Sequence, residues 1–83
     1  MAIVDFRSID SIHATDEIKT LAQGFLMASF ANLGVVDATL TQGSKSWTLN
    51  VGAVFNFPVL SGNNGWNAVT IDATGTDVEC VFI

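Results

Sequence analysis

The most regular alternation of apolar and polar positions in the chain lies at residues 45–57, KSWTLNVGAVFNF. Every second position from Trp47 to Phe57 is apolar, whereas Asn56 belongs to the opposite set. Because successive side chains of a β-strand point to opposite faces, this alternation predicts one long strand with an apolar face. The segment is longer than most strands, so Gly52 is expected to bend it and let it change partners.

The pattern before this strand has helical spacing. The apolar positions on one predicted helical face are Ile18, Leu21, Ala22, Phe25, Leu26 and Leu33. Asp16 and Glu17 suit the positive end of a helix dipole, and Gly34 suits the residue that ends a helix. The sequence therefore predicts a lead-in over residues 1–15 and a helical segment over residues 16–33, with the helix ending near residue 32.

Small residues recur on a second face of this predicted helix. They are Thr20, Gly24, Ala28 and Ala31. Such residues allow another backbone to come close, and two interpretations stay open. The helix packs tightly against the sheet of its own chain, or it contacts a neighbouring subunit.

After Gly34 the period changes from 3.6 to 2, which predicts strands over the rest of the chain. VVDATLT (35–41) alternates, and Gln42-Gly43-Ser44 is typical of a hairpin turn. Pro58 is expected to end the long strand because it cannot donate to a central ladder. A loop (61–65), a strand (66–74), a tight turn (75–77) and a last strand (78–83) follow, and AIVDF (2–6) is expected to be extended. The prediction is a mainly β fold, a small bent antiparallel barrel of five strands over residues 35–83 preceded by the helix.

The last strand, VECVFI, is apolar on both faces and is expected to need a neighbour on each side. Pairing with the next subunit, head to tail, would build a homo-oligomeric ring. The expected subunit interface consists of Val78, Cys80, Val81, Phe82 and Ile83. Composition favours self-association too, because the chain of 83 residues is 49% hydrophobic and only 13% charged.

This arrangement resembles the Sm-like (Hfq-type) family of ring-forming small β-barrels. TLTQG (39–43) and FNFPVL (55–60) resemble parts of the family's first motif, and TGTDVECVFI (74–83) resembles its second. The resemblance implies single-stranded RNA bound at the pore of the ring. The residues that would bind RNA are Asn56, Thr74, Gly75 and Asp77. Two positions depart from the family pattern: Gly52 replaces an Asp, and Thr74 replaces the Arg that contacts RNA.

Charge weakens the RNA-binding hypothesis. The net charge is −5, and Arg7, Lys19 and Lys45 are the only cations, so phosphate backbones and anionic membranes are disfavoured. A rival hypothesis is a structural or assembly protein, for example a phage-type component, that binds no nucleic acid. A third is a small acidic inhibitor of a basic host protein. The sequence shows neither a signal peptide nor a membrane span, so a cytoplasmic protein is expected, in the host cytoplasm if it is viral.

Catalytic chemistry has little support in the sequence. His13 and Cys80 are the candidates for nucleophilic chemistry, but Cys80 lies in an apolar strand and is expected to be buried and inert. One His and one Cys cannot supply a metal cluster, so no enzyme activity, metal or cofactor is predicted. Trp47 is expected in the core, while Trp66 is open to a subunit contact or a ligand platform.

Overall fold

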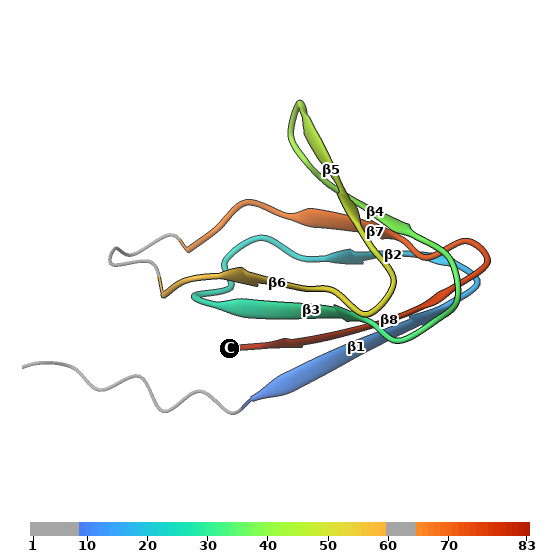
Figure 1. Ribbon diagram of the computed structural model, residues 1–83. Coiled ribbons are helices and arrows are strands. Elements are labelled where there is room, and N and C mark those ends of the chain that lie inside the picture. The colour runs from blue at the N-terminus through green and yellow to red at the C-terminus, as the bar shows by residue number, and fades with distance from the viewer. Residues whose placement is uncertain (1–8, 60–64) are drawn as a thin grey trace, which may run out of the picture.

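The computed structural model describes residues 9–59 and 65–83, and the regular elements in that part of the chain are all β-strands. They are β1 Asp10–Thr15, β2 Ile18–Leu21, β3 Ala28–Asn32, β4 Ala38–Gln42, β5 Lys45–Leu49, β6 Val54–Phe57, β7 Val69–Asp72 and β8 Asp77–Phe82. Two four-stranded sheets have the orders β1-β8-β3-β6 and β2-β7-β4-β5. The sheets lie in two layers, and the β4–β5 hairpin projects from one of them (Figure 1).

The strand order follows from rolling up one long hairpin. β1 pairs with β8, β2 with β7, β3 with β6 and β4 with β5, all antiparallel. The tip of this hairpin is the turn at Gly43 and Ser44. Rolling brings β3 beside β8 and β4 beside β7, which joins the pairs into two sheets. This is the jelly-roll arrangement, an eight-stranded double sheet.

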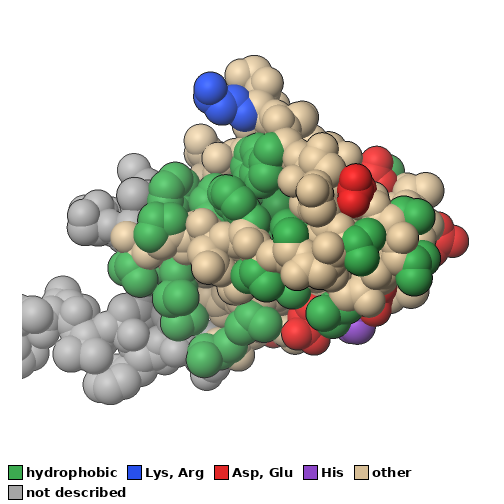
Figure 2. Space-filling model, viewed as in Figure 1, with side chains coloured by type: hydrophobic (Ala, Val, Ile, Leu, Met, Phe, Trp, Pro, Cys, Tyr) green, Lys and Arg blue, Asp and Glu red, His purple; other side chains and the backbone are tan. Residues whose placement is uncertain are grey.

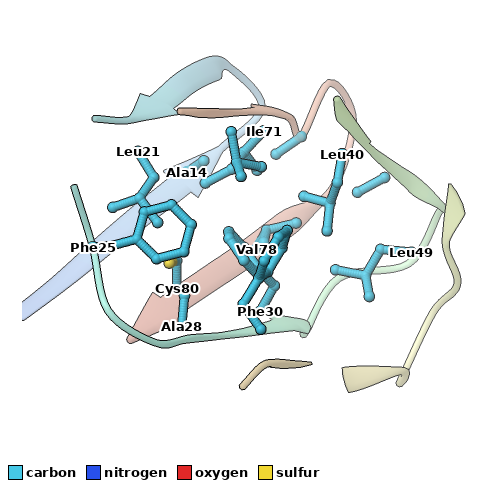
Figure 3. Close-up of a cluster of buried hydrophobic side chains, with 14 residues drawn as sticks. Ala14, Leu21, Phe25, Ala28, Phe30, Leu40, Leu49, Ile71, Val78 and Cys80 are labelled. Atoms are coloured by element: carbon cyan, nitrogen blue, oxygen red, sulfur yellow. The ribbon is translucent and has the colours of Figure 1, made fainter. Parts of the chain in front are cut away.

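The core lies between the two sheets and is built from alternate residues of their strands. In the first sheet Phe30 lies opposite Cys80, and in the second Leu40 lies between Ile71 and Trp47. Figure 3 shows Phe30 and Cys80 from the first sheet and Leu40 and Ile71 from the second pointing into the space between the layers. Each large apolar side chain removed from water contributes roughly 1.5–3 kcal/mol, which is the main stabilising term for so small a fold.

The predicted helix at residues 16–33 is wrong. That stretch forms β2, β3 and a connection in which Gly24 has a φ of 100°, a value that no α-helix contains. Buried positions alternate along β3, a period of 2 that the helical spacing concealed; they are Ala28, Phe30 and Asn32. The small residues Thr20, Gly24, Ala28 and Ala31 therefore do not share a helical face.

The long strand at residues 45–57 is two strands in different sheets, not one. Gly52, with a φ of 77°, lies in the turn between β5 and β6. The expected change of partners occurs at this turn, where the chain passes from one sheet to the other. The alternation still indicates the inward face, since Leu49 and Phe57 are buried. Val51 is the exception: it lies in the turn and is half exposed.

The predicted Sm-like barrel with an N-terminal helix is wrong as well. The sheets do not close, and β1, β6, β2 and β5 are their edge strands. The difference arises because residues 18–32 supply two strands and residues 45–57 supply another two. The predicted turn at 42–44, a strand within 66–74, the last strand and the end of β6 before Pro58 are confirmed. The expected extended segment 2–6 and most of the loop 61–65 lie outside the described residues.

Candidate interaction site

Four connections meet at one end of the molecule, which we call the loop end. They are residues 16–17, 33–37, 50–53 and 73–76, which join β1 to β2, β3 to β4, β5 to β6 and β7 to β8. All four lie on the right in Figure 1. Loops at the ends of rigid sheets are the usual places for binding residues.

Asn32 holds three of these connections together from the inside. It is 1% exposed, and its Nδ2 donates to the carbonyl oxygens of Val36 (2.8 Å) and Leu49 (2.9 Å). Its Oδ1 accepts from the backbone N–H of Gly34 (3.0 Å) and from Thr76 Oγ1 (2.8 Å). Every donor and acceptor of the side-chain amide is therefore used, which is the condition under which a buried polar group stabilises its surroundings.

The backbone adds further ties between the same loops. Asn32 accepts through its carbonyl oxygen from Gly52 N–H (3.0 Å), and Asp77 accepts from Leu33 N–H (2.7 Å). Gly34 packs so closely that a Cβ there would lie 2.0 Å from Thr76 Oγ1 and 2.5 Å from Asp77 N. The loop end is thus a braced surface and not a set of independent loops.

This braced surface displays apolar side chains to solvent. Val35 is 82% exposed, Leu33 60%, Val51 50% and Val36 45%, and we call these four residues the loop-end patch. Ile18 and Val54, both exposed, begin the strands that leave this end. Of nine exposed large hydrophobic residues in the described part of the chain, six therefore lie at or beside the loop end. Figure 2 shows hydrophobic and acidic side chains side by side there.

Acidic residues surround the patch. Seven of the eight acidic residues lie in the described ranges, and five of these seven are in the loop-end connections or at the strand ends beside them: Asp16, Glu17, Asp37, Asp72 and Asp77. Lys19 offsets one of them, since its Nζ lies 3.2 Å from Glu17. The loop end therefore carries a local negative charge around an apolar centre.

Several of these carboxylates also brace the loops. Asp16 accepts from Gly75 N–H (2.8 Å) and Asp37 from Val51 N–H (3.2 Å). Asp72 accepts two hydrogen bonds from Thr74, one from the Thr74 hydroxyl (2.6 Å) and one from the Thr74 backbone N–H (3.1 Å). These two bonds lower the pKa of Asp72 below its ordinary value of 3.8, and the bond from the Thr74 side chain has the larger effect. Asp72 is therefore charged at neutral pH.

In the described part of the chain, His13 and Asp77 form the arrangement that most resembles an acid–base pair. His13 Nε2 contacts Asp77 Oδ1, which also accepts from Thr15 Oγ1 at 3.0 Å. All three lie on the outer face of the β1–β8 pair, where His13 is half exposed. Within the described residues no nucleophile is hydrogen-bonded to either of them, so His13 and Asp77 form a surface cross-strand pair.

The residues predicted to bind RNA do not form one site. Thr74 and Gly75 lie in the β7–β8 turn, and Asp77 begins β8. Asn56 lies on edge strand β6, in register with Ser29 and through it with Val81. Val81 follows Asp77 by four residues, roughly 13 Å at about 3.3 Å per residue, so Asn56 is remote from the turn. Thr74 and Asp77 instead serve the hydrogen bonds given above.

The predicted interface strand lies in the middle of a sheet. β8 has β1 on one side and β3 on the other, so both its neighbours come from the same chain. Val78 and Cys80 are buried, and Val81 is 38% exposed on the outer face. Phe82 and Ile83 line a cavity of about 520 Å³ between β1 and β2. Main-chain pairing of this strand with another subunit is not available in this fold.

Burial decides the chemistry of Cys80. It is 0% exposed, and desolvation raises the pKa of its thiol to about 12, so the reactive thiolate is suppressed. In the described residues no group of three or more His, Cys, Asp or Glu side chains could hold a metal ion. None of the described residues belongs to a helix that could cross a membrane.

Both tryptophans belong to an aromatic cluster. Trp47 lies on the inner face and packs 5.0 Å from Phe55, as predicted for a core position, although it is only partly buried. Trp66 packs edge-on against Phe57 at 5.1 Å and donates from Nε1 to the carbonyl oxygen of Pro58 (2.9 Å). These contacts give Trp66 a structural role in its own chain.

Sequence reasoning missed the loop end. The sequence pattern predicts that a helix ends at Leu33-Gly34 and that a strand starts at Val35-Val36, and it assigns no role to Asn32. One signal was available: Gly34 and Asp37 flank the two valines, and Gly and Asp are typical of turns and loops.

Comparison of the chain with protein-family models, with curated proteins and with solved structures finds no match.

Proposed function

We propose that this protein is a non-catalytic structural or assembly protein that acts through protein–protein contact, with the loop end as its docking surface. The observation that carries the proposal is the gathering of exposed hydrophobic side chains at one braced, acidic end. Exposed apolar patches with a polar rim are characteristic of interaction sites. Val35 is 82% exposed and therefore contributes little buried apolar area to its own chain.

The chemistry of the surface defines the partner. An apolar centre favours an apolar patch on another protein, and the acidic rim favours lysine and arginine around that patch. The same rim repels phosphate backbones, which disfavours the RNA-binding hypothesis at Thr74, Gly75 and Asp77. Analogy at the level of fold agrees, since jelly rolls occur in viral capsid proteins as well as in lectins and cupins, but this fold hosts many functions.

A binding measurement with two designed peptides tests the proposal. The probes are an amphipathic lysine–leucine peptide and a glutamate–leucine peptide of equal length, each labelled for fluorescence anisotropy. The lysine–leucine peptide should bind, the glutamate–leucine peptide should not, and added salt should weaken the binding. Replacing Val35 and Val51 by Ser should raise the Kd by about tenfold.

Val59→Ser is the matched control, because Val59 is 68% exposed and follows β6 at the other end of the sheet. This variant should bind as the wild type does. Binding of neither peptide, or equal loss in the Val59→Ser control, would contradict the proposal. Binding of a U-rich RNA oligonucleotide in the same assay would favour the RNA-binding alternative instead.

A further inference from the structure

A cavity of about 520 Å³ opens at the end of the molecule opposite to the loop end. It lies where β1 begins, where β8 ends and where the chain leaves β2 for β3. β1 and β2 are edge strands of different sheets, so in the described part of the chain no ladder of hydrogen bonds joins the two layers on this side. The volume is in the range of roughly 300–1,000 Å³ that is typical of small-molecule sites.

The deep walls of this cavity are apolar. Leu21 and Phe25, which are 1% and 3% exposed, belong both to the core and to the lining of the cavity. Figure 3 shows these two side chains at one end of the core. Ile12 and Phe82 also line the cavity, and both are partly buried against the same core. An apolar ligand placed here would therefore extend the hydrophobic core outward between the sheets.

Backbone hydrogen bonds fix the shape of the cavity. Ile83 N–H donates to the carbonyl oxygen of Met27 (3.1 Å), and Leu26 N–H donates to the carbonyl oxygen of Ile83 (2.6 Å). These bonds tie the end of β8 to the connection between β2 and β3. Trp66 N–H donates to the carbonyl oxygen of Phe25 (2.8 Å) and holds the same connection from its other side. The cavity is thus preformed, as small-molecule sites usually are.

One carboxylate occupies an inward position beside this apolar space. Ile12 and Ala14 of β1 pack in the core, and Asp10 continues their alternation at the start of the strand. Asp10 also lines the cavity, and its Oδ1 accepts from the backbone N–H of Ser11 (2.8 Å). The described lining residues include no Lys, Arg or His. The cavity therefore favours a positive charge on a ligand over a negative one.

We propose that this cavity binds a small amphipathic amine, whose apolar ring or branched chain enters the space between the sheets while its ammonium group faces Asp10. Burial of the apolar body supplies most of the affinity, because removing apolar area from water is the main favourable term. Asp10 is exposed and supplies selectivity for the charge. Thr20 and Gln23, also exposed and in the lining, offer a hydroxyl and an amide to a polar substituent. The site is remote from the loop-end patch, so the proposal does not depend on the docking function.

An NMR titration of the full chain with three probes of similar size tests this proposal. Phenethylamine carries a positive charge, phenethyl alcohol no charge and hydrocinnamate a negative charge. Phenethylamine should bind with the lowest Kd, and the Kd of hydrocinnamate should be at least about threefold higher, as expected for one exposed carboxylate. The backbone amide shifts should be largest at lining residues such as Ile12, Leu21 and Phe25.

Two substitutions separate the contribution of the charge from that of the space. Asp10→Asn should raise the Kd of phenethylamine about threefold and leave the Kd of phenethyl alcohol unchanged. Ala22 is an exposed lining residue, so Ala22→Phe should fill the cavity and raise both Kd values at least about tenfold. Glu79→Gln removes a carboxylate from the outer face of β8, and Ser44→Phe adds a ring at the exposed hairpin tip. Both of these matched controls should bind as the wild type does, and circular dichroism verifies that each variant folds.

Three results would overturn the proposal. The first is that hydrocinnamate binds as tightly as phenethylamine, and the second is that Asp10→Asn leaves the Kd of phenethylamine unchanged. The third is that the probes shift no resonance of the lining residues, or shift only those of the loop end.

Discussion

Thr76 Oγ1 donates a 2.8 Å hydrogen bond to Asn32 Oδ1 inside the loop end, across 44 positions of sequence. Both side chains are buried, at 5% and 1% exposure. The bond joins the β7–β8 connection to the last residue of β3, while Asn32 Nδ2 reaches Val36 and Leu49. The exposed valines of the candidate docking surface therefore rest on a fully satisfied polar cluster.

Asn32→Ala should destabilise the fold by about 3 kcal/mol, because it leaves buried donors and acceptors without partners. Urea denaturation measures the change. Asn67→Ala is the control, since Asn67 is exposed and uses its backbone oxygen to accept from Gln42. A loss below about 1 kcal/mol for Asn32→Ala would mean that water replaces the amide.

Leu40→Ala should lower the free energy of unfolding by about 3 kcal/mol, because Leu40 is 0% exposed between the sheets and its truncation leaves a cavity. Val35→Ala, at a position that is 82% exposed, should change the free energy of unfolding by less than about 0.5 kcal/mol. Thermal or urea unfolding of the pair measures the contrast. Similar losses in both variants would show that Val35 is part of the core.

Gly34→Ala and Gly52→Ala should differ, because the two glycines are required for different reasons. At Gly34 the new Cβ would meet Thr76 Oγ1 and the backbone of Asp77, which we expect to cost roughly 2–3 kcal/mol. At Gly52 a Cβ would meet no other atom, but the φ of 77° is unfavourable for Ala. We expect this strain to lower the free energy of unfolding by about 1 kcal/mol. Urea midpoints for the two variants should follow that order, and the reverse order would contradict the packing of Gly34.

The Cys80 thiol should react with Ellman's reagent only after the chain unfolds, because it is buried and its pKa is raised to about 12. Between about pH 9 and 12 the unfolded chain loses this proton first, so the stability of the fold should decrease as pH rises. Cys80→Ala should lack this part of the alkaline dependence. Rapid reaction of the native protein at pH 8 would show that the β8 core opens locally.

Thr74→Ala should raise the pKa of Asp72 toward 3.8, since the hydroxyl of Thr74 is the first cause of its lowering. Because the pKa of Asp72 is lowered in the folded state, its charged carboxylate stabilises the fold at pH values above the ordinary pKa of the group. This contribution to stability is lost as the pH falls through the folded-state pKa. NMR titration of the Asp72 carboxyl measures the shift. Thr74→Ser keeps the hydroxyl and should keep the low pKa, so an equal rise in both variants would contradict the assignment.

Much of the second half of the fold could be predicted because its strands are local patterns. Thr39 and Leu40 alternate outward and inward as their period of 2 requires, Gly43 makes the hairpin turn, and Pro58 follows the end of β6. The first half could not be predicted, because Leu21 and Phe25 have the spacing of a helix although Leu21 ends β2 and Phe25 lies in the β2–β3 connection. Whether this segment adopts the helical period of 3.6 or the strand period of 2 depends on partners that are distant in sequence. These partners are β7 for β2, and β6 and β8 for β3.

The sequence by itself determined that this is a small, acidic and strongly apolar chain, rich in alternating strands, with a cysteine in a buried strand. Only the tertiary structure decided that the strands form a rolled double sheet and that β8 is central. It also decided that Asn32, Val35, Val51 and Thr76 meet at one end. The physical reason is that alternation specifies which face of a strand is buried, whereas strand order depends on long-range pairing that no local pattern encodes.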